Sequence, residues 1–169
     1  DARRPLILDS GCGSAESVRR LAASFPDCFV VGVDRSAARL ARAPSLPDNA
    51  CVVRARIEDF WRLLDERGVR LRRHYLLYPN PWPKAAHLRR RWHAHPVFPV
   101  LLRLGGRLEL RANWRTYLQE FRLAARLGGV DGGKVVSFRP IDPLTPFERK
   151  FDDSGHALYR LTLNLENDA

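Results

Sequence analysis

Short apolar runs alternate with amphipathic stretches along the chain. A short apolar run is typical of a parallel strand buried on both faces, and apolar positions three or four residues apart are typical of a helix that packs by one face. We therefore expect strands at residues 5–8, 29–33, 51–53, 74–78, 106–110, 134–138 and 157–165. We expect helices at residues 15–24, 36–42, 58–66 and 114–127. This alternation predicts an α/β fold built from successive βα units.

Prolines and capping residues mark where some of these elements end. The stretch 79–83 is rich in proline, which supplies no ladder donor, so we expect a loop directly after the fourth strand. Near the other end of the chain, Thr145 precedes Pro146, and Glu148 follows three residues after Thr145. This spacing predicts a short helix with a capping box, in which proline occupies the first helical position.

Composition limits the class of protein. A chain of 169 residues suits one domain, and we expect residues 1–169 to form it, because neither a repeat nor a linker interrupts the pattern. Apolar runs stay well below the roughly 20 residues needed to cross a bilayer, so we expect no membrane partner. Lys and Arg number 29 against 19 Asp and Glu, for a net charge of +10. This excess predicts a polyanionic partner such as nucleic acid. The alternative is that the genome favours arginine codons and the arginines are simply solvated at the surface.

Cysteine and methionine usage add two expectations. Cys12, Cys28 and Cys51 are odd in number and form no CxxC pair, so we expect neither a disulfide framework nor a metal site, and a reducing, cytoplasmic environment. The chain begins at Asp1 and contains no methionine. We therefore expect a processed, trimmed or incompletely recorded chain, which can lack an N-terminal segment.

A glycine loop follows the first expected strand. Gly11 and Gly13 flank Cys12, and this spacing lets the backbone pass close to a ligand at the start of the next helix. Asp34 closes the second strand about twenty residues further on, where a carboxylate accepts hydrogen bonds from ribose hydroxyls. The sequence therefore predicts a cofactor that contains a nucleoside.

Two cofactors compete for this loop, namely a dinucleotide and S-adenosyl-L-methionine. A pyrophosphate site prefers a third glycine, but Glu16 stands at that position and its charge would repel phosphate. Asp9, directly before the turn, suits the cationic methionine part of S-adenosyl-L-methionine. We therefore expect S-adenosyl-L-methionine, and a turn without a ligand is the remaining alternative.

The proline-rich loop 79–83 carries the second candidate constellation. Asn80 lies between two prolines, and a rigid loop at the end of a strand can hold one polar side chain against a substrate base. Ligands of open α/β sheets bind at the carboxyl ends of the strands, beside the point where the strand order reverses. The residues after the loop are basic, which favours an acidic substrate; a proline-rich surface loop followed by a solvated basic segment is the alternative.

Together these segments resemble the tRNA (guanine-N7)-methyltransferase family over about residues 6–161. The specific matches are the run Pro79–Lys84 with His87 and Arg90, followed by Thr145-x-Phe147-Glu148. The resemblance implies a Rossmann-like class I methyltransferase fold, with a mostly parallel seven-stranded sheet and helices on both faces. It also implies S-adenosyl-L-methionine as cofactor and tRNA as the polyanionic partner.

The resemblance further implies a role for each matched position. The cofactor would be held by Asp9, Gly11, Cys12 and Gly13 in the loop, by Asp34 and Arg35 at the ribose, by Arg56 and Ile57 at the adenine, and by Asn80. Asn80 would also be the catalytic residue. The tRNA would be bound by Lys84, His87 and Arg90, and its target guanosine by Asn113, Thr145 and Glu148.

Three positions depart from the family pattern. Asn80 and Asn113 stand where the family has aspartate, and Arg56 stands where it usually has an acidic residue. Aspartate accepts hydrogen bonds from guanine N1–H and N2–H, whereas asparagine brings no charge and adds donors. Loss of one charge-assisted bond costs roughly 1.5–3 kcal/mol, which slows or redirects an enzyme without removing its fold.

These departures keep other functions open. One is a paralogue with the same pocket and another methyl acceptor, first another RNA base and then a small molecule. Asn-Pro-aromatic also resembles the loop of amino-directed nucleic-acid methyltransferases, although their usual second proline is missing. The last is a non-catalytic RNA-binding module that retains the cofactor fold.

Overall fold

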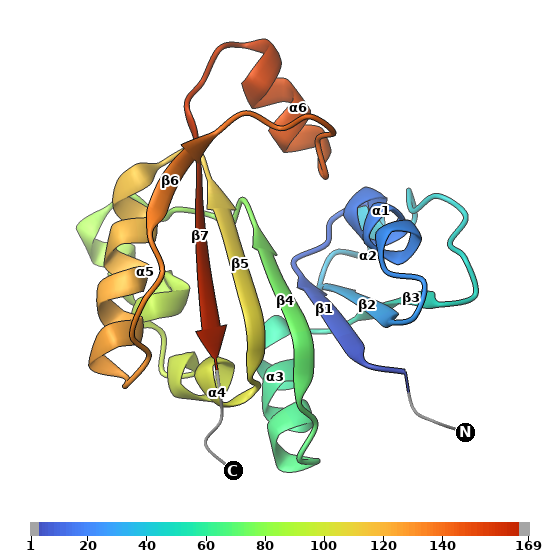
Figure 1. Ribbon diagram of the computed structural model, residues 1–169, viewed down its shortest axis with the longest axis horizontal. Coiled ribbons are helices and arrows are strands. Elements are labelled where there is room, and N and C mark those ends of the chain that lie inside the picture. Colours follow the sequence, from blue (N-terminus) through green and yellow to red (C-terminus); the bar gives the residue numbers. More distant parts are fainter. Residues whose placement is uncertain (1–3, 166–169) are drawn as a thin grey trace.

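The computed structural model describes residues 4–165, and a single sheet organises them (Figure 1). Its seven strands lie in the order β3-β2-β1-β4-β5-β7-β6. Their bounds are β1 Leu6–Ser10, β2 Phe29–Asp34, β3 Ala50–Arg54, β4 Leu71–Leu77, β5 Gly106–Ala112, β6 Val135–Phe138 and β7 Leu158–Leu165. The strands β1 to β5 pair in parallel, whereas β7 runs antiparallel to β5 and to β6. The expected mostly parallel seven-stranded sheet is confirmed.

Helices cover both faces of this sheet, also as expected. Their bounds are α1 Glu16–Ser24, α2 Ala37–Leu40, α3 Ile57–Glu66, α4 Phe98–Arg103, α5 Arg115–Leu127 and α6 Pro146–Asp153. The alternation of side chains along β1 places Ile7 in the core beneath α1 and Leu8 in the larger core shared with α3, α4 and α5. Figure 1 shows α6 beyond the carboxyl-terminal ends of β4 and β5.

The strand order sets the place of a ligand site. The chain runs outward from β1 to β3 and then returns to lay β4 on the other side of β1. The loops after β1 and β4 therefore diverge at the carboxyl edge of the sheet, which is the position where open α/β sheets bind ligands. The glycine loop follows β1 and the proline-rich loop follows β4, so the fold brings the two predicted constellations to one edge.

Some boundaries differ from the sequence pattern. The fourth strand begins at Leu71 and ends at Leu77, because the backbone of Tyr78 turns into the left-handed region at a φ of 53°. The pattern does not predict α4, because its apolar run is short and carries Pro99. Proline is harmless there, since the first turn of a helix leaves its N–H groups unpaired anyway. Two short 3₁₀ helices, Ala85–Arg90 and Trp92–Ala94, follow the proline-rich loop.

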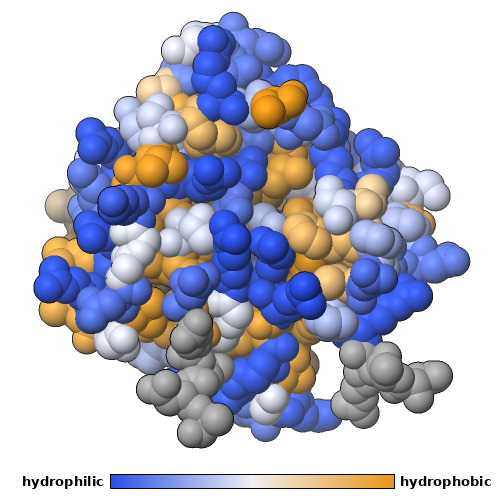
Figure 2. Space-filling view, in the orientation of Figure 1, coloured by the Kyte–Doolittle hydropathy of each residue, from blue (hydrophilic) through white to orange (hydrophobic). Residues whose placement is uncertain are grey.

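Arginines line one face of β5 and β7. Arg107 and Arg111 alternate with core residues of β5, and Arg160 pairs with Arg111 across the strands. Figure 1 shows no helix over this face, and Figure 2, drawn from the same side, shows hydrophilic side chains gathered there. Arg107 has no acidic partner within residues 4–165. Arg107 therefore displays positive charge on the sheet, whereas the charge of Arg111 is neutralised by Glu109 and Glu148.

Candidate cofactor and acceptor site

The glycine loop is held against the end of β2. The backbone N–H groups of Gly11 and Cys12 both donate to the carbonyl oxygen of Val33, at 2.7 and 3.1 Å. Gly11 and Gly13 adopt φ angles of 87° and 59°, a region that L side chains rarely occupy. A Cβ added at Gly13 would meet no atom within 4 Å, so the backbone there borders open space. The loop has the conformation and the access that a bound ligand requires.

Asp34 connects this loop to the start of α2. Its Oδ2 accepts from the backbone N–H of Gly13 at 3.0 Å, and its Oδ1 accepts from that of Ser36 at 2.8 Å. Arg39 also donates to Oδ2, at 3.2 Å. The carboxylate is almost fully buried, yet Oδ1, which has one donor, keeps capacity for a further donor such as a ribose hydroxyl. The expected position of Asp34 beside the loop is confirmed, and its contact with ribose stays a prediction.

The carboxyl group of Asp9 is buried beneath the loop and only partly hydrogen-bonded. Its Oδ2 accepts from the hydroxyl of Ser17 at 2.5 Å, whereas its buried Oδ1 has no hydrogen-bond partner within residues 4–165. Burial raises the pKa of Asp9 to about 7, and the neighbouring Asp34 adds to this while the Ser17 bond opposes it. A buried, unpaired carboxylate oxygen is costly, so a cation at this point would stabilise the ionised form. The group fits the cationic methionine part of S-adenosyl-L-methionine.

The remaining predicted cofactor residues lie around the loop in different ways. Ile57 is in contact distance, since a Cβ added at Gly11 would lie 3.6 Å from its Cδ1. The thiol of Cys12 points into the core toward Gly32, so only its backbone faces the loop. The side chain of Arg56 is 69% exposed and pairs with Glu58. Arg35 is exposed.

The proline-rich loop presents Asn80 in a fixed turn. Its Oδ1 accepts from the backbone N–H of Trp82 at 3.2 Å, and the residue is exposed. Tyr78 and Trp82, on either side, both have positive φ angles, at 53° and 44°. Such angles are strained for non-glycine residues and persist only where the surroundings impose them. The direction of the Asn80 side chain is therefore set by the whole loop.

Two of the three predicted tRNA-binding residues contact the ring of Trp82. The imidazole of His87 lies edge-on to Trp82 with centroids 5.4 Å apart, and the guanidinium of Arg90 lies 4.8 Å from the Trp82 centroid. Lys84, at the start of the same segment, is exposed. The structure thus places all three on the surface beside the Asn80 turn, and their contact with RNA stays a prediction.

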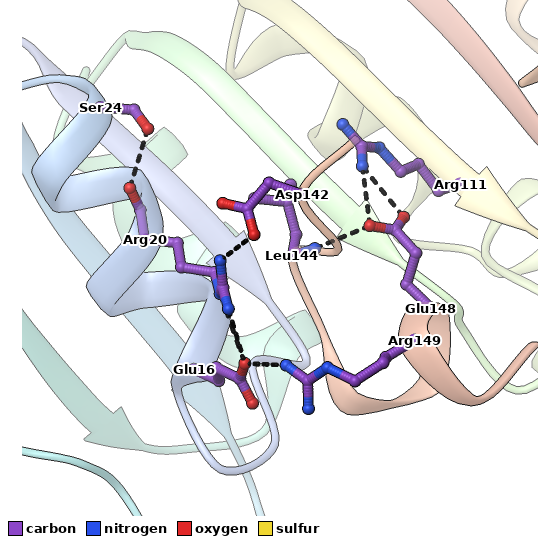
Figure 3. Close-up of polar contacts among 8 residues, drawn as sticks. All are labelled: Glu16, Arg20, Ser24, Arg111, Asp142, Leu144, Glu148 and Arg149. Carbon is purple, nitrogen blue, oxygen red and sulfur yellow. Dashed lines mark hydrogen bonds and ion pairs between the residues drawn. The ribbon is translucent and has the colours of Figure 1, made fainter. Parts of the chain in front are cut away.

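Glu148 does not face an open substrate pocket. Its side chain is fully buried and is enclosed by protein donors (Figure 3). Oε1 accepts from the Tyr78 hydroxyl at 2.8 Å and from Arg111 at 2.9 Å, and Oε2 accepts from the backbone N–H of Leu144 at 2.7 Å. A sequence reading finds Glu148 but not these partners, which lie directly after β4, on β5 and in the loop before α6. Glu148 therefore joins α6 to the sheet in this structure.

The expected capping box of α6 is only half formed. The Thr145 hydroxyl accepts from the backbone N–H of Glu148 at 3.0 Å, as the spacing predicts. The reciprocal bond, from the backbone N–H of Thr145 to the Glu148 carboxylate, is absent from the bonds within residues 4–165, because Arg111 and Leu144 engage that carboxylate instead. Asn113 lies exposed directly after β5. Thr145 and Asn113 thus keep side chains near the surface, and their role at the acceptor stays a prediction.

Ion pairs hold α6 and the loop before it against α1. Glu16, the first residue of α1, accepts from Arg149 at 2.5 Å and from Arg20 at 3.3 Å. Arg20 also pairs with Asp142 (Figure 3). These contacts bring the segment that contains Thr145 next to the helix that follows the glycine loop. The candidate cofactor and acceptor residues therefore share one region of the molecule.

A buried polar cluster supports the loop from below. The Ser10 hydroxyl accepts from Trp61 Nε1 at 2.9 Å and lies 2.8 Å from His74 Nε2. Burial lowers the pKa of His74 to about 3, so the imidazole is neutral and shares one hydrogen bond with the Ser10 hydroxyl through Nε2. These three residues come from β1, α3 and β4. A histidine within an apolar strand is the one sequence signal that points to this cluster.

Some features are absent from the part of the chain that the structure describes. Within residues 4–165, groups of three or more His, Cys, Asp or Glu with metal-binding geometry are absent. None of the helices described there has the length and apolar character to cross a bilayer. Cys12, Cys28 and Cys51 are free thiols.

Comparison with known proteins identifies relatives over nearly the whole chain. Residues 3–161 match the model of a family described as "Putative methyltransferase". The tRNA (guanine-N(7)-)-methyltransferase of Acidithiobacillus ferrooxidans is 30% identical, over 94% of this chain and 75% of that protein. That of Halorhodospira halophila is also 30% identical, over 97% of this chain and 76% of that protein.

Solved structures show the same fold at lower sequence identity. The 16S rRNA methyltransferase KamB superimposes with a TM-score of 0.72 at 15% identity, over 98% of this chain and 89% of that one. A 16S rRNA (adenine(1408)-N(1))-methyltransferase from Catenulisporales acidiphilia gives a TM-score of 0.67 at 18% identity, over 99% and 90% of the two chains. Both support the Rossmann-like methyltransferase architecture.

Proposed function

The chain belongs to the tRNA (guanine-N(7)-)-methyltransferase family, and from this premise we propose that it transfers a methyl group from S-adenosyl-L-methionine to N7 of a guanine in tRNA. The observation that carries the proposal is the pair of carboxylates at the glycine loop. Asp34 fixes Gly13 and keeps acceptor capacity, and Asp9 buries an oxygen without a partner within residues 4–165. This pair suits a ligand that carries both ribose hydroxyls and a positive charge.

The cofactor half of the site has a role for each part. S-adenosyl-L-methionine supplies an electrophilic methyl group on a sulfonium. Asp34 accepts from the ribose hydroxyls, Ile57 packs against the adenine, and Asp9 accepts from the ammonium of the methionine part. The left-handed backbone at Gly13 leaves room for the ligand to approach the loop.

The acceptor half acts by alignment. Guanine N7 has an available lone pair, so methyl transfer requires the correct placement of the base more than removal of a proton. The Asn80 carboxamide, held in its turn, orients the base as the catalytic residue, with Asn113 and Thr145 beside it. Lys84, His87 and Arg90 bind the phosphates of the tRNA backbone, in keeping with the net charge of +10. The free thiols support action in the reducing cytoplasm.

The direct experiment is methyl transfer from labelled S-adenosyl-L-methionine to tRNA from a strain that lacks the N7 modification. Mass analysis of the digested tRNA identifies the modified nucleoside. The control is Asp34→Ala, which removes the acceptor for Gly13 and for ribose and is expected to abolish incorporation. Absence of 7-methylguanosine with the wild-type chain, at cofactor concentrations shown by calorimetry to saturate it, refutes the proposal.

A second candidate is methyl transfer to another acceptor, and Asn80 and Asn113 are the observation that favours it. Both carboxamides are neutral where the family carries aspartate, and Asn80 can accept through its carbonyl oxygen from an exocyclic amino group. Asn80→Asp distinguishes the candidates. Guanine N7 activity that appears only in this variant supports a different natural acceptor, whereas activity already present in the wild type supports guanine. Cofactor binding without transfer to any RNA supports a non-catalytic module.

A further inference from the structure

A buried arginine lies directly behind the Asn80 turn. Arg91 is only 5% exposed, although it ends a run of three arginines whose other two members are exposed. Its Nε and Nη2 both donate to the backbone carbonyl oxygen of Trp82, at 3.2 and 3.1 Å. Trp82 is the residue whose backbone N–H donates to Asn80. The guanidinium therefore fixes the carbonyl side of Trp82, the residue whose N–H closes the Asn80 turn.

The same guanidinium also contacts the start of α5. Its Nη1 donates to Glu120 Oε2 at 2.5 Å, and its Cζ lies 5.0 Å from the ring centroid of Trp114. Trp114 directly follows Asn113, and Glu120 lies in the second turn of α5. Glu120 is also 3.0 Å from His93 Nε2, which secures the carboxylate from a second side. One cation thus bridges the loop that carries Asn80 and the element that begins beside Asn113.

We propose that Arg91 is a positioning residue, which holds the Asn80 turn and the start of α5 in one fixed relation. The effect on methyl transfer rests on the proposed function, whereas the effect on the loop follows from the contacts of Arg91 alone. Trp82 has a φ of 44° and Tyr78 a φ of 53°. Such conformations cost about 1–3 kcal/mol each and need an external constraint to persist. Arg91 supplies that constraint at Trp82.

Arginine is the residue type that this role requires. The planar fork offers two donors to one carbonyl oxygen and a third, on the opposite edge, to a carboxylate. A lysine keeps the charge and reaches only one of these partners well. Arg91→Lys is therefore the informative substitution, because it leaves Glu120 with a cation and removes the fork.

The first measurement reports on the loop without using activity. The chain has four tryptophans, so protein labelled with 5-fluorotryptophan gives a ¹⁹F spectrum in which Trp82→Phe assigns the Trp82 signal. In Arg91→Lys we expect the Trp82 signal to shift or broaden, while the signal of Trp61, buried beneath the glycine loop, stays in place. Arg89→Met is the matched control, since Arg89 belongs to the same run but is exposed. It should leave the Trp82 signal unchanged.

The second measurement separates positioning from binding. We expect kcat of Arg91→Lys to fall about 100-fold, because small errors in the alignment of reacting groups have effects of this size, while the cofactor Kd by calorimetry remains that of the wild type. An unshifted Trp82 signal together with wild-type kcat overturns the proposal, and so does a shift of all four tryptophan signals, which would indicate general unfolding. If the wild-type chain methylates no RNA, the proposed function fails, and the ¹⁹F result alone decides whether Arg91 orders the loop.

Discussion

The hydroxyl of Tyr78 donates a hydrogen bond of 2.8 Å to the carboxylate of Glu148, across 70 positions of sequence. Tyr78 begins the proline-rich loop and Glu148 lies in the first turn of α6. Burial, followed by the negative charge of Glu148, raises the pKa of the Tyr78 hydroxyl, so it remains a donor across the physiological range. This bond ties the two acceptor segments together from behind.

Removal of either partner should destabilise the protein to different extents. Tyr78→Phe should lower the free energy of unfolding by about 0.5–1.5 kcal/mol, because Arg111 and Leu144 still satisfy the carboxylate. Glu148→Ala should cost about 3–5 kcal/mol, since it breaks a buried ion pair and leaves donors without their acceptor. Urea unfolding followed by circular dichroism measures both. Tyr159→Phe is the matched control, and an equal loss there would contradict a specific role of the Tyr78 bond.

Two buried groups should give the stability opposite responses to pH. His74 has a pKa lowered to about 3, so below its usual 6.5 the unfolded chain binds more protons than the folded one and stability falls on acidification. Asp9 has a pKa raised from 3.8 to about 7, so the folded chain binds more protons in that range and stability falls as pH rises. Each slope reaches at most about 1.4 kcal/mol per pH unit. In the overlapping range the two effects oppose each other.

The variant His74→Gln isolates the contribution of Asp9. It keeps a polar side chain beside Ser10 but removes the titrating imidazole. Relative to the wild type, the variant should therefore lose stability progressively as pH rises from the pKa of Asp9 in the unfolded chain toward 6.5. Urea midpoints at several pH values in this range give the difference directly. Parallel profiles for variant and wild type would show that His74 is not held neutral by burial.

Cofactor binding should release a proton near neutral pH. A cation beside the free Oδ1 favours the ionised form of Asp9, whose pKa is about 7 in the folded chain. Calorimetry with S-adenosyl-L-methionine in two buffers of different ionisation enthalpy measures this release. Ser17→Ala should increase it at pH 7, because the bond from Ser17 lowers the pKa of Asp9. Asp9→Asn should bind without any release, and release that persists in this variant would assign the proton to another group.

A methyl group added at Gly32 should disturb the packing of α1 against β2. A Cβ there would lie 2.4 Å from Val18 Cγ2 and 2.8 Å from Cys12 Sγ. Overpacking of this kind costs about 1–3 kcal/mol, so Gly32→Ala should unfold at lower urea and bind cofactor more weakly. Adding Val18→Ala removes the closest clash and should recover part of the stability. Two losses that simply add would mean that Gly32 and Val18 do not share this contact.

The cofactor half of the site could be read from the sequence because its determinants are local. Gly11, Gly13 and Asp34 are specified by their spacing within one βα unit, and the structure places them together. The family resemblance and the fold are confirmed by the comparisons and the sheet order. The roles assigned to individual residues toward cofactor and tRNA remain predictions.

The residues that hold the acceptor half in place could not be predicted from the sequence pattern. Arg91 is the third arginine in a row, and only the end of a 3₁₀ helix at that point turns it inward while Arg89 and Arg90 stay exposed. Two partners of Glu148, Arg111 and Tyr78, lie 37 and 70 positions away, so local spacing suggested a complete capping box. The competition between a local and a distant partner is decided by tertiary packing, which a linear pattern does not contain.

The missing side chain at Gly32 has a consequence for how this protein can change over time. It lets α1 pack closely against β2, so a larger side chain at this position would push the helix outward and lower the free energy of unfolding. Residues 139–153 are fastened to α1 by surface pairs of Arg149 and Arg20, which are weak individually, and to the sheet by the buried Glu148. Exposed positions of that segment therefore tolerate substitution more readily than Gly32 does, and changes that alter the acceptor side can accumulate there without loss of the methyl-donor loop.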